Sequence, residues 1–436
     1  MIVPSRLFWL LVGLGLLLAL AGLFVRGAEL LLIPYNIVLF LTLWLTGRLA
    51  AKQDFLLVKR RVDPILSVRV QNQVSLTVEN QSDQPVELMI RDEPPMGCRS
   101  TQHEFRTKLG ADRSKTFSYQ ILPIERGSDS FRGTYIRYKA PLGLAWIQKK
   151  FDTEQPARIY PNVLALREYE LLKQKGHLEQ MGVRRSRIKG LGTEFESLRD
   201  YNEDDIRIVD WKATSRRGKL VVKNFEQERN QAVIVCFDVG RHMLAQIDGV
   251  RKLDYTLDAG LMLMYAAERM GDQIGTLVFN DQVKRWIAPK KGRHQVAAIL
   301  DTIHALHAEA VQPDHVRAFS YLGSRWKRRS LIVLFTDAET KEDSQELIAA
   351  LGPFARRHLL FIVRVMDPRL RELQTMKVED DRDFYDKAAS LIYARDRREA
   401  ENLLSVAGYQ SIEAEPQELS GALVTAYLRV KELNLI

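Results

Sequence analysis

The sequence VIVCFD at residues 233–238 and the sequence LIVLFTD at residues 331–337 decide how this chain folds. Each is a short apolar run, rich in β-branched residues, that ends in an acidic residue, Asp238 or Asp337. This pattern is typical of neighbouring parallel strands that are buried on both faces. Ligands of such sheets bind at the carboxyl ends of the strands. The two carboxylates are therefore predicted to meet at one edge, where a divalent cation or a cationic partner could bind.

Strands and helices alternate over residues 231–436, which predicts an open α/β sheet. Residues 253–270 have helical spacing, and residues 273–287 predict a hairpin. A further strand is expected at residues 359–365. The region is therefore predicted to form a doubly wound, Rossmann-like, mostly parallel sheet with one antiparallel edge strand.

Two apolar runs at the start of the chain predict a transmembrane helical hairpin over residues 1–51. Residues 7–25 are uncharged and about as long as a bilayer span, and residues 30–45 form a second run. Basic residues lie outside both runs, so the positive-inside rule places the two flanks in the cytoplasm. The alternative is a cleaved signal peptide, because residues 19–21 read Ala-Leu-Ala, which resembles a cleavage site.

Short alternating segments separated by turn signals fill residues 62–155. Residues 75–79 and 86–90 alternate apolar and polar side chains on either side of a polar turn. Regular short strands of this kind predict an antiparallel, immunoglobulin-like β-sandwich. The segment shows no catalytic set of residues, so we expect a spacer or a partner-docking domain.

The 436 residues are enough for two or three domains, and 46% hydrophobic with 27% charged residues is the composition of a globular protein. The net charge of +9 would suit nucleic acid or an acidic membrane surface. The apolar start of the chain favours the membrane, so lipid and not nucleic acid is the expected partner. Cys98 and Cys236 lack metal-ligand spacing, which favours a reducing compartment.

Residues 156–230 predict a connector followed by a charged segment. From residue 194 onward, acidic and basic residues are interleaved with apolar anchors such as Phe195, Leu198 and Tyr201. The anchors predict an ordered segment whose ions pair with a partner. A salt-bridge network within the chain is the alternative. The candidate partner-binding residues are Glu194, Arg199, Asp204, Arg207, Asp210, Trp211, Lys212, Arg216 and Arg217.

The charged segment also carries a resemblance to a known family. The sequences LRDY at 198–201, DDIR at 204–207, DWKA at 210–213 and LVVK at 220–223 match the signature of domain-of-unknown-function family 58. The resemblance implies that residues 231–436 are similar to a von Willebrand factor A-like domain. It also implies a bacterial inner-membrane protein, here with two membrane passes, that acts with a MoxR-type AAA+ ATPase.

The von Willebrand resemblance allows a comparison at the edge of the sheet. Metal-binding members carry Asp-x-Ser-x-Ser after the first strand, whereas this chain reads DVGRH from Asp238 and lacks both hydroxyls. Asp337 fits the later acidic position, and Asp314 could replace the usual threonine. Because Mg²⁺ prefers six oxygen ligands, we expect a degenerate site with weak Mg²⁺ binding at most, and no other cofactor. The alternative is that both carboxylates pair with Arg241 or His242.

Three functions remain open on these grounds. The first is a membrane-anchored cytoplasmic adaptor, not an enzyme, which binds a MoxR-type ATPase and an unknown client and aids the assembly or activation of other proteins. The second is a metal-dependent adhesion module, which the altered metal motif disfavours. The third is a hydrolase that uses Asp238 and Asp337, although the sequence shows no nucleophile and base at a recognisable spacing. The adaptor is the function that the sequence favours most.

Overall fold

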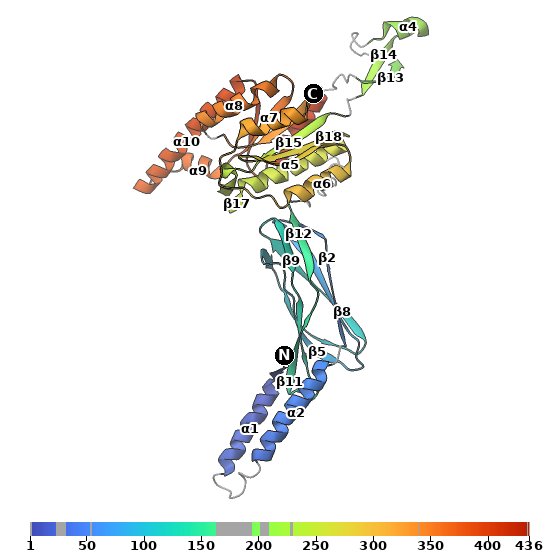
Figure 1. Ribbon diagram of the computed structural model, residues 1–436, viewed down its shortest axis with the longest axis vertical. Coiled ribbons are helices and arrows are strands. Elements are labelled where there is room, and N and C mark those ends of the chain that lie inside the picture. The colour runs from blue at the N-terminus through green and yellow to red at the C-terminus, as the bar shows by residue number, and fades with distance from the viewer. Residues whose placement is uncertain are drawn as a thin grey trace. The chain divides into compact units, whose positions relative to one another are not determined.

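The computed structural model describes residues 2–22, 32–52, 55–162, 194–200, 209–226, 230–338, 340–433 and 435. The chain divides into two compact units, Met1–Tyr160 and Pro161–Ile436. Each unit builds hydrophobic cores from its own residues (Figure 1).

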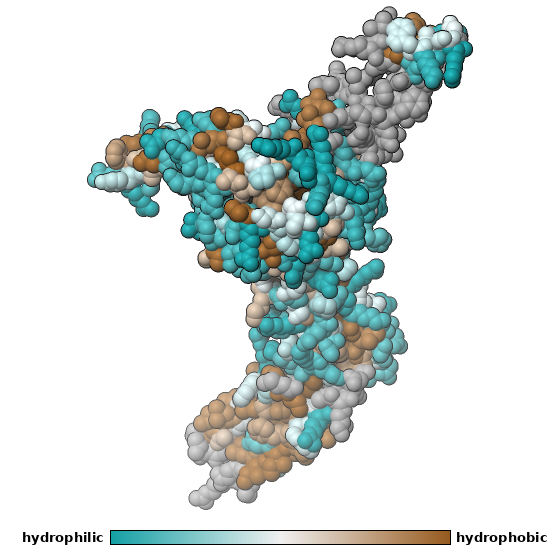
Figure 2. All heavy atoms as spheres, turned by 45° about the horizontal axis from the view of Figure 1, so that its top comes forward, coloured by the Kyte–Doolittle hydropathy of each residue, from teal (hydrophilic) through white to brown (hydrophobic). Residues whose placement is uncertain are grey.

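The first unit begins with two paired helices, α1 (Arg6–Gly22) and α2 (Leu32–Lys52). The Tyr35 hydroxyl of α2 donates a hydrogen bond to the Leu11 carbonyl of α1 at 2.8 Å. Both helices expose apolar side chains (Figure 2).

The predicted transmembrane hairpin is wrong. Among the helices of the described residues, none is both long enough and apolar enough to cross a bilayer. Helix α1 is described over 17 residues. Helix α2 carries Asn36, Arg48 and Lys52 within its length. The predicted two-pass location in the bacterial inner membrane, with cytoplasmic soluble domains, is corrected together with the hairpin.

The strands of the first unit are β1 (Ile2–Pro4), β2 (Leu56–Val62), β3 (Ile65–Ser67), β4 (Asn72–Asn80), β5 (Val86–Arg91), β6 (Cys98–Ser100), β7 (Glu104–Leu109), β8 (Arg113–Pro123), β9 (Gly127–Phe131), β10 (Thr134–Lys139), β11 (Ala145–Phe151) and β12 (Gln155–Tyr160). They form one sheet of order β1-β11-β10-β5-β7, a second of order β2-β4-β8-β6 and a third of order β3-β12-β9.

The first two of these sheets pack face to face. Every second residue of β4 is buried, because successive side chains of a strand point to opposite faces. Leu76 and Val78 of β4 share a core with Ile90 of β5 and Ile136 of β10. The β3-β12-β9 sheet contributes to a smaller, separate core.

The second unit begins with an antiparallel hairpin and continues into a six-stranded sheet. The hairpin consists of β13 (Glu194–Asp200) and β14 (Val221–Glu226), with the short helix α4 (Trp211–Arg217) between them in sequence. The sheet has the order β19-β18-β15-β20-β21-β22. Its strands are β15 (Ala232–Asp238), β18 (Gln273–Phe279), β19 (Val283–Lys290), β20 (Ser330–Phe335), β21 (Leu359–Val365) and β22 (Gln410–Ala414).

All neighbours in this sheet are parallel except β19, which pairs antiparallel with β18 at one edge. Strands β15 and β20 coincide with the two apolar runs at 233–238 and 331–335 to within one residue. The chain proceeds from β15 to β18 on one side and later returns to β20 on the other. The strand order therefore reverses between β15 and β20, which is where parallel sheets bind ligands.

Helices cover both faces of the sheet. One face packs against α5 (Lys252–Arg269), α6 (Arg293–Ile303) and α11 (Leu419–Glu432). The other packs against α7 (His315–Arg325), α8 (Lys341–Ala355) and α10 (Asp381–Val406). Helix α9 (Pro368–Thr375) lies beside α10. The remaining short elements are η2 (Pro141–Gly143), η5 (Arg241–Leu244), β16 (Gln246–Ile247) and β17 (Val250–Arg251).

Candidate functional site at the carboxyl edge of the parallel sheet

Asp238, the last residue of β15, is buried at the carboxyl edge of the sheet. Its Oδ1 accepts the Gly240 backbone N–H at 2.7 Å, and its Oδ2 accepts the Thr336 hydroxyl at 2.7 Å. Burial raises the pKa of Asp238 to about 6, since these two hydrogen bonds compensate only in part for the lost hydration. A Cβ at Gly240 would come within 2.9 Å of the Val311 carbonyl oxygen. The position that carries serine in metal-binding domains therefore has no room for a side chain here.

His315, the first residue of α7, is the third polar group of a row that also contains Asp238 and Thr336. Its Nε2 lies 3.2 Å from the Thr336 hydroxyl and 4.0 Å from Asp238 Oδ2. Burial lowers the pKa of His315 to about 4, so the ring is neutral at pH 7. Because Thr336 donates to Asp238, its oxygen accepts from His315, which assigns the proton to Nε2.

Asp337 lies next to this row of polar groups and faces two cations. Lys252 Nζ donates to Asp337 Oδ2 at 2.6 Å. Arg397 Nη1 lies 3.2 Å from Oδ1, an ion pair without the alignment of a hydrogen bond. Burial alone would raise the pKa of Asp337, but Arg397 and Lys252 together hold it below its ordinary value. Asp337 is therefore an ionised carboxylate whose charge is neutralised from within the chain.

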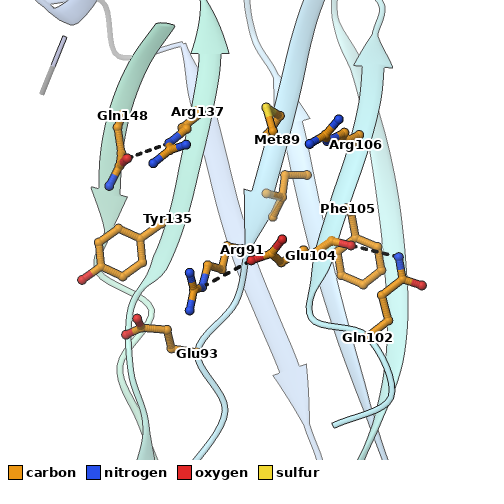
Figure 3. A pocket seen from close by; sticks show the side chains of 11 residues that line it. Met89, Arg91, Glu93, Gln102, Glu104, Phe105, Arg106, Tyr135, Arg137 and Gln148 are labelled. Carbon is orange, nitrogen blue, oxygen red and sulfur yellow. Dashed lines mark hydrogen bonds and ion pairs between the residues drawn. The ribbon is translucent and has the colours of Figure 1, made fainter. Parts of the chain in front are cut away.

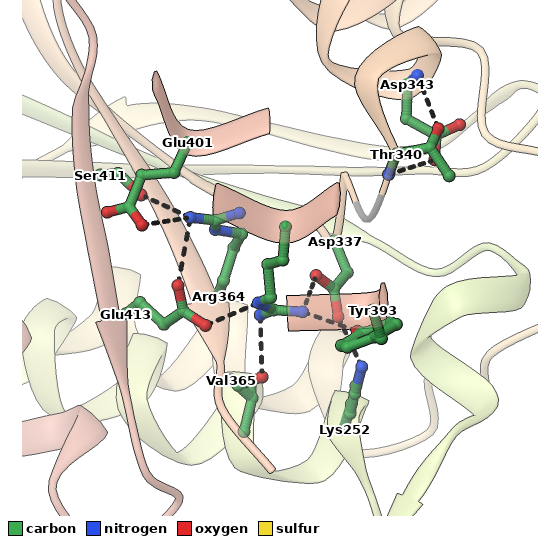
Figure 4. Close-up of polar contacts among 11 residues, drawn as sticks. Lys252, Asp337, Thr340, Asp343, Arg364, Val365, Tyr393, Glu401, Ser411 and Glu413 are labelled. Atoms are coloured by element: carbon green, nitrogen blue, oxygen red, sulfur yellow. Dashed lines mark hydrogen bonds and ion pairs between the residues drawn. The ribbon is translucent and has the colours of Figure 1, made fainter. Parts of the chain in front are cut away.

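Arg397 connects this pair to a larger network, of which Figure 4 labels Tyr393, Arg364 and Glu413. The Nε of Arg397 donates to Glu413 of β22 at 2.6 Å, and its Nη1 donates to the Tyr393 hydroxyl at 2.8 Å. The same Glu413 lies 3.2 Å from the fully buried Arg364 of β21. The network therefore fixes α10 against the ends of three neighbouring strands.

The structure brings the predicted Asp238 and Asp337 to the same edge, but their partners differ from those expected. Arg241 pairs with neither carboxylate, and its Nε lies 3.4 Å from His242 Nε2. The Asp314 side chain caps α7 and accepts the Arg317 N–H at 2.8 Å. The sequence comparison missed the groups that do contact the carboxylates: Thr336, His315, Lys252 and Arg397.

This edge does not fit a magnesium ion. Both oxygens of Asp337 face cations, both oxygens of Asp238 accept hydrogen bonds, and Gly240 supplies no oxygen from a side chain. No group of three His, Cys, Asp or Glu side chains in the described part of the chain is arranged to hold a metal ion.

The charged segment places part of the predicted binding set on α4. Asp210 caps this helix and accepts the N–H groups of Lys212 and Ala213, each at 3.0 Å. At the other end Gly218 adopts φ +64°, a left-handed conformation that glycine accepts readily, and its N–H bonds the Thr214 carbonyl at 2.9 Å. The Trp211 side chain is 62% exposed.

The remaining residues of the predicted set are placed unevenly. Lys212 and Arg216 are exposed on α4, and Arg217 is the last residue of that helix. Glu194 and Arg199 belong to β13. Asp204 and Arg207 lie outside the described residues.

A concave surface of about 700 Å³ lies on the outer face of β5, β7, β10 and β11 (Figure 3). Arg91 lies 3.7 Å from Glu104, and Arg137 donates to Gln148 at 2.7 Å. Because two of its arginines are paired within the surface itself, we assign no ligand to it.

Comparison with known proteins finds sequence matches to only part of this chain. The family model described as "Protein of unknown function DUF58" matches residues 197–383, which confirms the family resemblance over that part of the chain. The chain is similar to the uncharacterized protein YeaD of Bacillus subtilis (strain 168), with 27% identity over 128 residues, or 29% of this chain and 31% of YeaD. The match therefore spans about a third of that relative.

Two solved structures show weaker likeness. The conserved hypothetical protein BatB from Bacteroides thetaiotaomicron is 12% identical, with a TM-score of 0.29, and the match covers 46% of this chain and 99% of that one. The CARDB domain of the PF1109 protein from Pyrococcus furiosus is 10% identical, with a TM-score of 0.17, over 24% of this chain and 86% of that one.

Proposed function

We propose that this chain is a protein-binding adaptor rather than an enzyme, that its parallel sheet is a von Willebrand factor A-like domain, and that its partner is a MoxR-type AAA+ ATPase. The observation that carries the proposal is the exposure of Trp211 beside the exposed Lys212 and Arg216 on α4. Tryptophan and arginine dominate the residues whose loss most weakens protein interfaces. A helix capped at both ends presents them in a defined arrangement.

The partner follows from the family resemblance, which the match over residues 197–383 supports. Those residues include α4, so the exposed set lies within the matched part. Together with the ATPase, the adaptor would assist the assembly or activation of a client protein.

The polar groups at the edge of the sheet support binding without metal or catalysis. Lys252 and Arg397 supply to Asp337 the positive charge that a metal ion would supply. The Thr336 hydroxyl lies 3.2 Å from His315 Nε2, but Thr336 is 1% exposed and its hydroxyl donates to Asp238. A nucleophile must be free to meet a substrate, so this arrangement favours the adaptor over the hydrolase.

Affinity for the ATPase tests the proposal. The full chain is titrated against the MoxR-type ATPase of the same organism with Mg²⁺ and ATP. We expect Trp211→Ala to weaken binding by about 2 kcal/mol, roughly 30-fold, as is typical of an interface hot spot. Arg216→Ala should have a smaller effect of the same sign, and neither variant should shift the melting temperature of the chain.

Lys219→Ala is the matched control, because Lys219 is exposed just beyond the same helix. It should bind as the unchanged chain does. If Trp211→Ala binds the ATPase with unchanged affinity, α4 is not the docking element and the proposed function loses its main support.

A further inference from the structure

A groove of about 590 Å³ lies between α7 and α8 on the second unit. Small residues form part of its wall, and a Cβ at Gly323 would come within 2.9 Å of the Phe354 ring. The absence of a side chain at Gly323 therefore lets the two helices approach closely. The main lining residues are Val316, Phe319, Gly323, Trp326, Ala350 and Phe354. The groove can thus receive apolar side chains.

Basic residues gather at one end of this groove. Residues 325–329 read RWKRR and residues 356–358 read RRH. The Arg357 guanidinium donates to the Lys327 carbonyl at 3.5 Å, which places the two segments side by side. The six Lys and Arg side chains of these segments are exposed, and none pairs with a carboxylate of the described residues. We call this surface the basic groove.

The helix dipole favours a cation near the C-terminal end of a helix, where α7 and α8 end in this surface. The dipole alone does not call for six exposed cations, none of them paired with a carboxylate among the residues that the structure describes. Such a cluster creates a positive field that attracts an anionic partner. The basic groove is therefore suited to a ligand with both acidic and apolar side chains.

The free end of α10 has this composition. Residues 379–386 read EDDRDFYD, so five acidic residues and one basic residue give 1 − 5 = −4 in a chain of net charge +9. Phe384 and Tyr385 are 58% and 71% exposed. Leu391 and Ile392 follow two turns later on the same side of the helix and are also exposed. We call residues 379–392 the acidic arm, whose apolar side chains gather at the projecting end of the helix (Figure 2).

The acidic arm and the basic groove lie at opposite edges of one sheet. The basic segments lead directly into the first residues of β20 and β21, at the amino edge. Arg397 of α10 contacts Asp337, just beyond the carboxyl end of β20, and the arm precedes Arg397 along the helix. It therefore extends past the carboxyl edge, and α9 and α10 project together from the sheet (Figure 1). The arm of one chain cannot reach the groove of the same chain.

We propose that the acidic arm of one copy of this chain docks in the basic groove of a second copy. The opposite charges steer the encounter, and the exposed rings of Phe384 and Tyr385 supply the apolar anchors. The arm and the groove lie at opposite edges of the sheet, so one copy can contact two others, and such a heterologous contact builds rings or open chains. This inference does not depend on α4 or on the ATPase.

Sedimentation velocity of the full chain at increasing concentration, up to about 100 µM, tests the proposal. We expect species larger than a dimer at 0.1 M salt and their dissociation at 1 M salt, because the Debye length falls from about 10 Å to about 3 Å. The arm variant Phe384→Ala, Tyr385→Ala and the groove variant Arg328→Glu, Arg356→Glu should each remain monomeric.

A mixture of the two variants gives the sharpest result. Each contributes one intact surface, so an equal mixture should form dimers and nothing larger. Lys291→Glu, Arg293→Glu is the control, since it makes the same change of charge at exposed residues at the start of α6, on the opposite face of the sheet. This control should assemble as the unchanged chain does. A chain that stays monomeric throughout, or variants that still assemble, would overturn the proposal.

Discussion

At the scale of single residues, the carboxyl edge of the sheet holds two buried acids whose pKa values shift in opposite directions. Asp337 remains charged because Lys252 and Arg397 face it, whereas the pKa of Asp238 rises to about 6 because burial favours its neutral form. Both acids stand at the carboxyl ends of adjacent strands, Asp238 as the last residue of β15 and Asp337 two residues beyond β20. The sequence could not indicate Lys252, which lies 85 residues away from Asp337 and meets it only through tertiary packing.

Removal of the Lys252 ammonium should be costly. Lys252→Met leaves a buried carboxylate with only the poorly aligned Arg397, and loss of one member of a buried pair typically costs about 3–5 kcal/mol. We expect the free energy of unfolding in urea at pH 7 to fall by an amount near the lower end of that range. Lys284→Met, which breaks an ion pair of 3.1 Å to the half-exposed Glu309, should cost less than about 1 kcal/mol. Equal losses in the two variants would contradict the assigned role of Lys252.

The pH dependence of stability should reveal Asp238 and His315 as an opposed pair. The raised pKa of Asp238, about 6 in the folded chain, contributes stability below its unfolded pKa near 4 that is lost as pH rises to 6. The lowered pKa of His315, about 4, contributes stability above pH 6.5 that is lost as pH falls to 4. The two slopes cover nearly the same window with opposite signs, so the unchanged chain should show little net slope from this pair.

Single variants separate the two slopes. His315→Gln should lose stability as pH rises from 4 to 6, and Asp238→Asn should gain stability as pH rises from 4 to 6.5, each by about 3 kcal/mol at 1.36 kcal/mol per pKa unit. Urea unfolding at pH values across this window, relative to the unchanged chain, measures both. Parallel pH profiles for the two variants would show that the assignment of these groups is wrong.

At the scale of elements, the sequence was most informative where the pattern of apolar residues and the length of the run both indicated a buried strand. The two buried strands were located to within one residue. The apolar run at the start of the chain was misleading, because hydrophobicity suggested a membrane span, whereas no helix among the described residues is long and apolar enough to cross a bilayer. The sequence predicted the Asp210–Arg216 region as charged and ordered, but its structure as a short helix depends on two caps that only the backbone geometry shows.

The N-cap of α4 can be tested separately from the rest of the unit. A seven-residue helix is marginal alone, and loss of an N-cap costs about 1 kcal/mol. Asp210→Ala should therefore increase hydrogen exchange at the amides of Lys212 and Ala213 and weaken ATPase binding, with an unchanged melting temperature. Asp314→Ala, which removes the N-cap of the core helix α7, should instead lower the melting temperature. A drop in melting temperature for Asp210→Ala would place α4 in the cooperative core and not on a docking surface.

At the scale of the whole molecule, the chain consists of two units with separate cores. Leu76 belongs to the core of the sandwich and Leu334 to one core of the parallel sheet. The sequence indicated both architectures through the period of their apolar residues, two in one and alternating with helices in the other. It could not indicate the charge pattern that links one copy to another, because the basic groove forms from segments that are distant in sequence.

Separate cores predict separate unfolding transitions. Leu76→Ala and Leu334→Ala each empty a fully buried site, and such cavities cost about 2–5 kcal/mol. In calorimetry at 1 M salt, where assembly should be absent, each substitution should lower the melting temperature of one transition. A loss of 2 kcal/mol should appear as a shift of about 4–8 °C for units of this size. If either substitution shifts both transitions equally, the two units unfold as one cooperative body, and an effect on one unit could not be assigned to that unit alone.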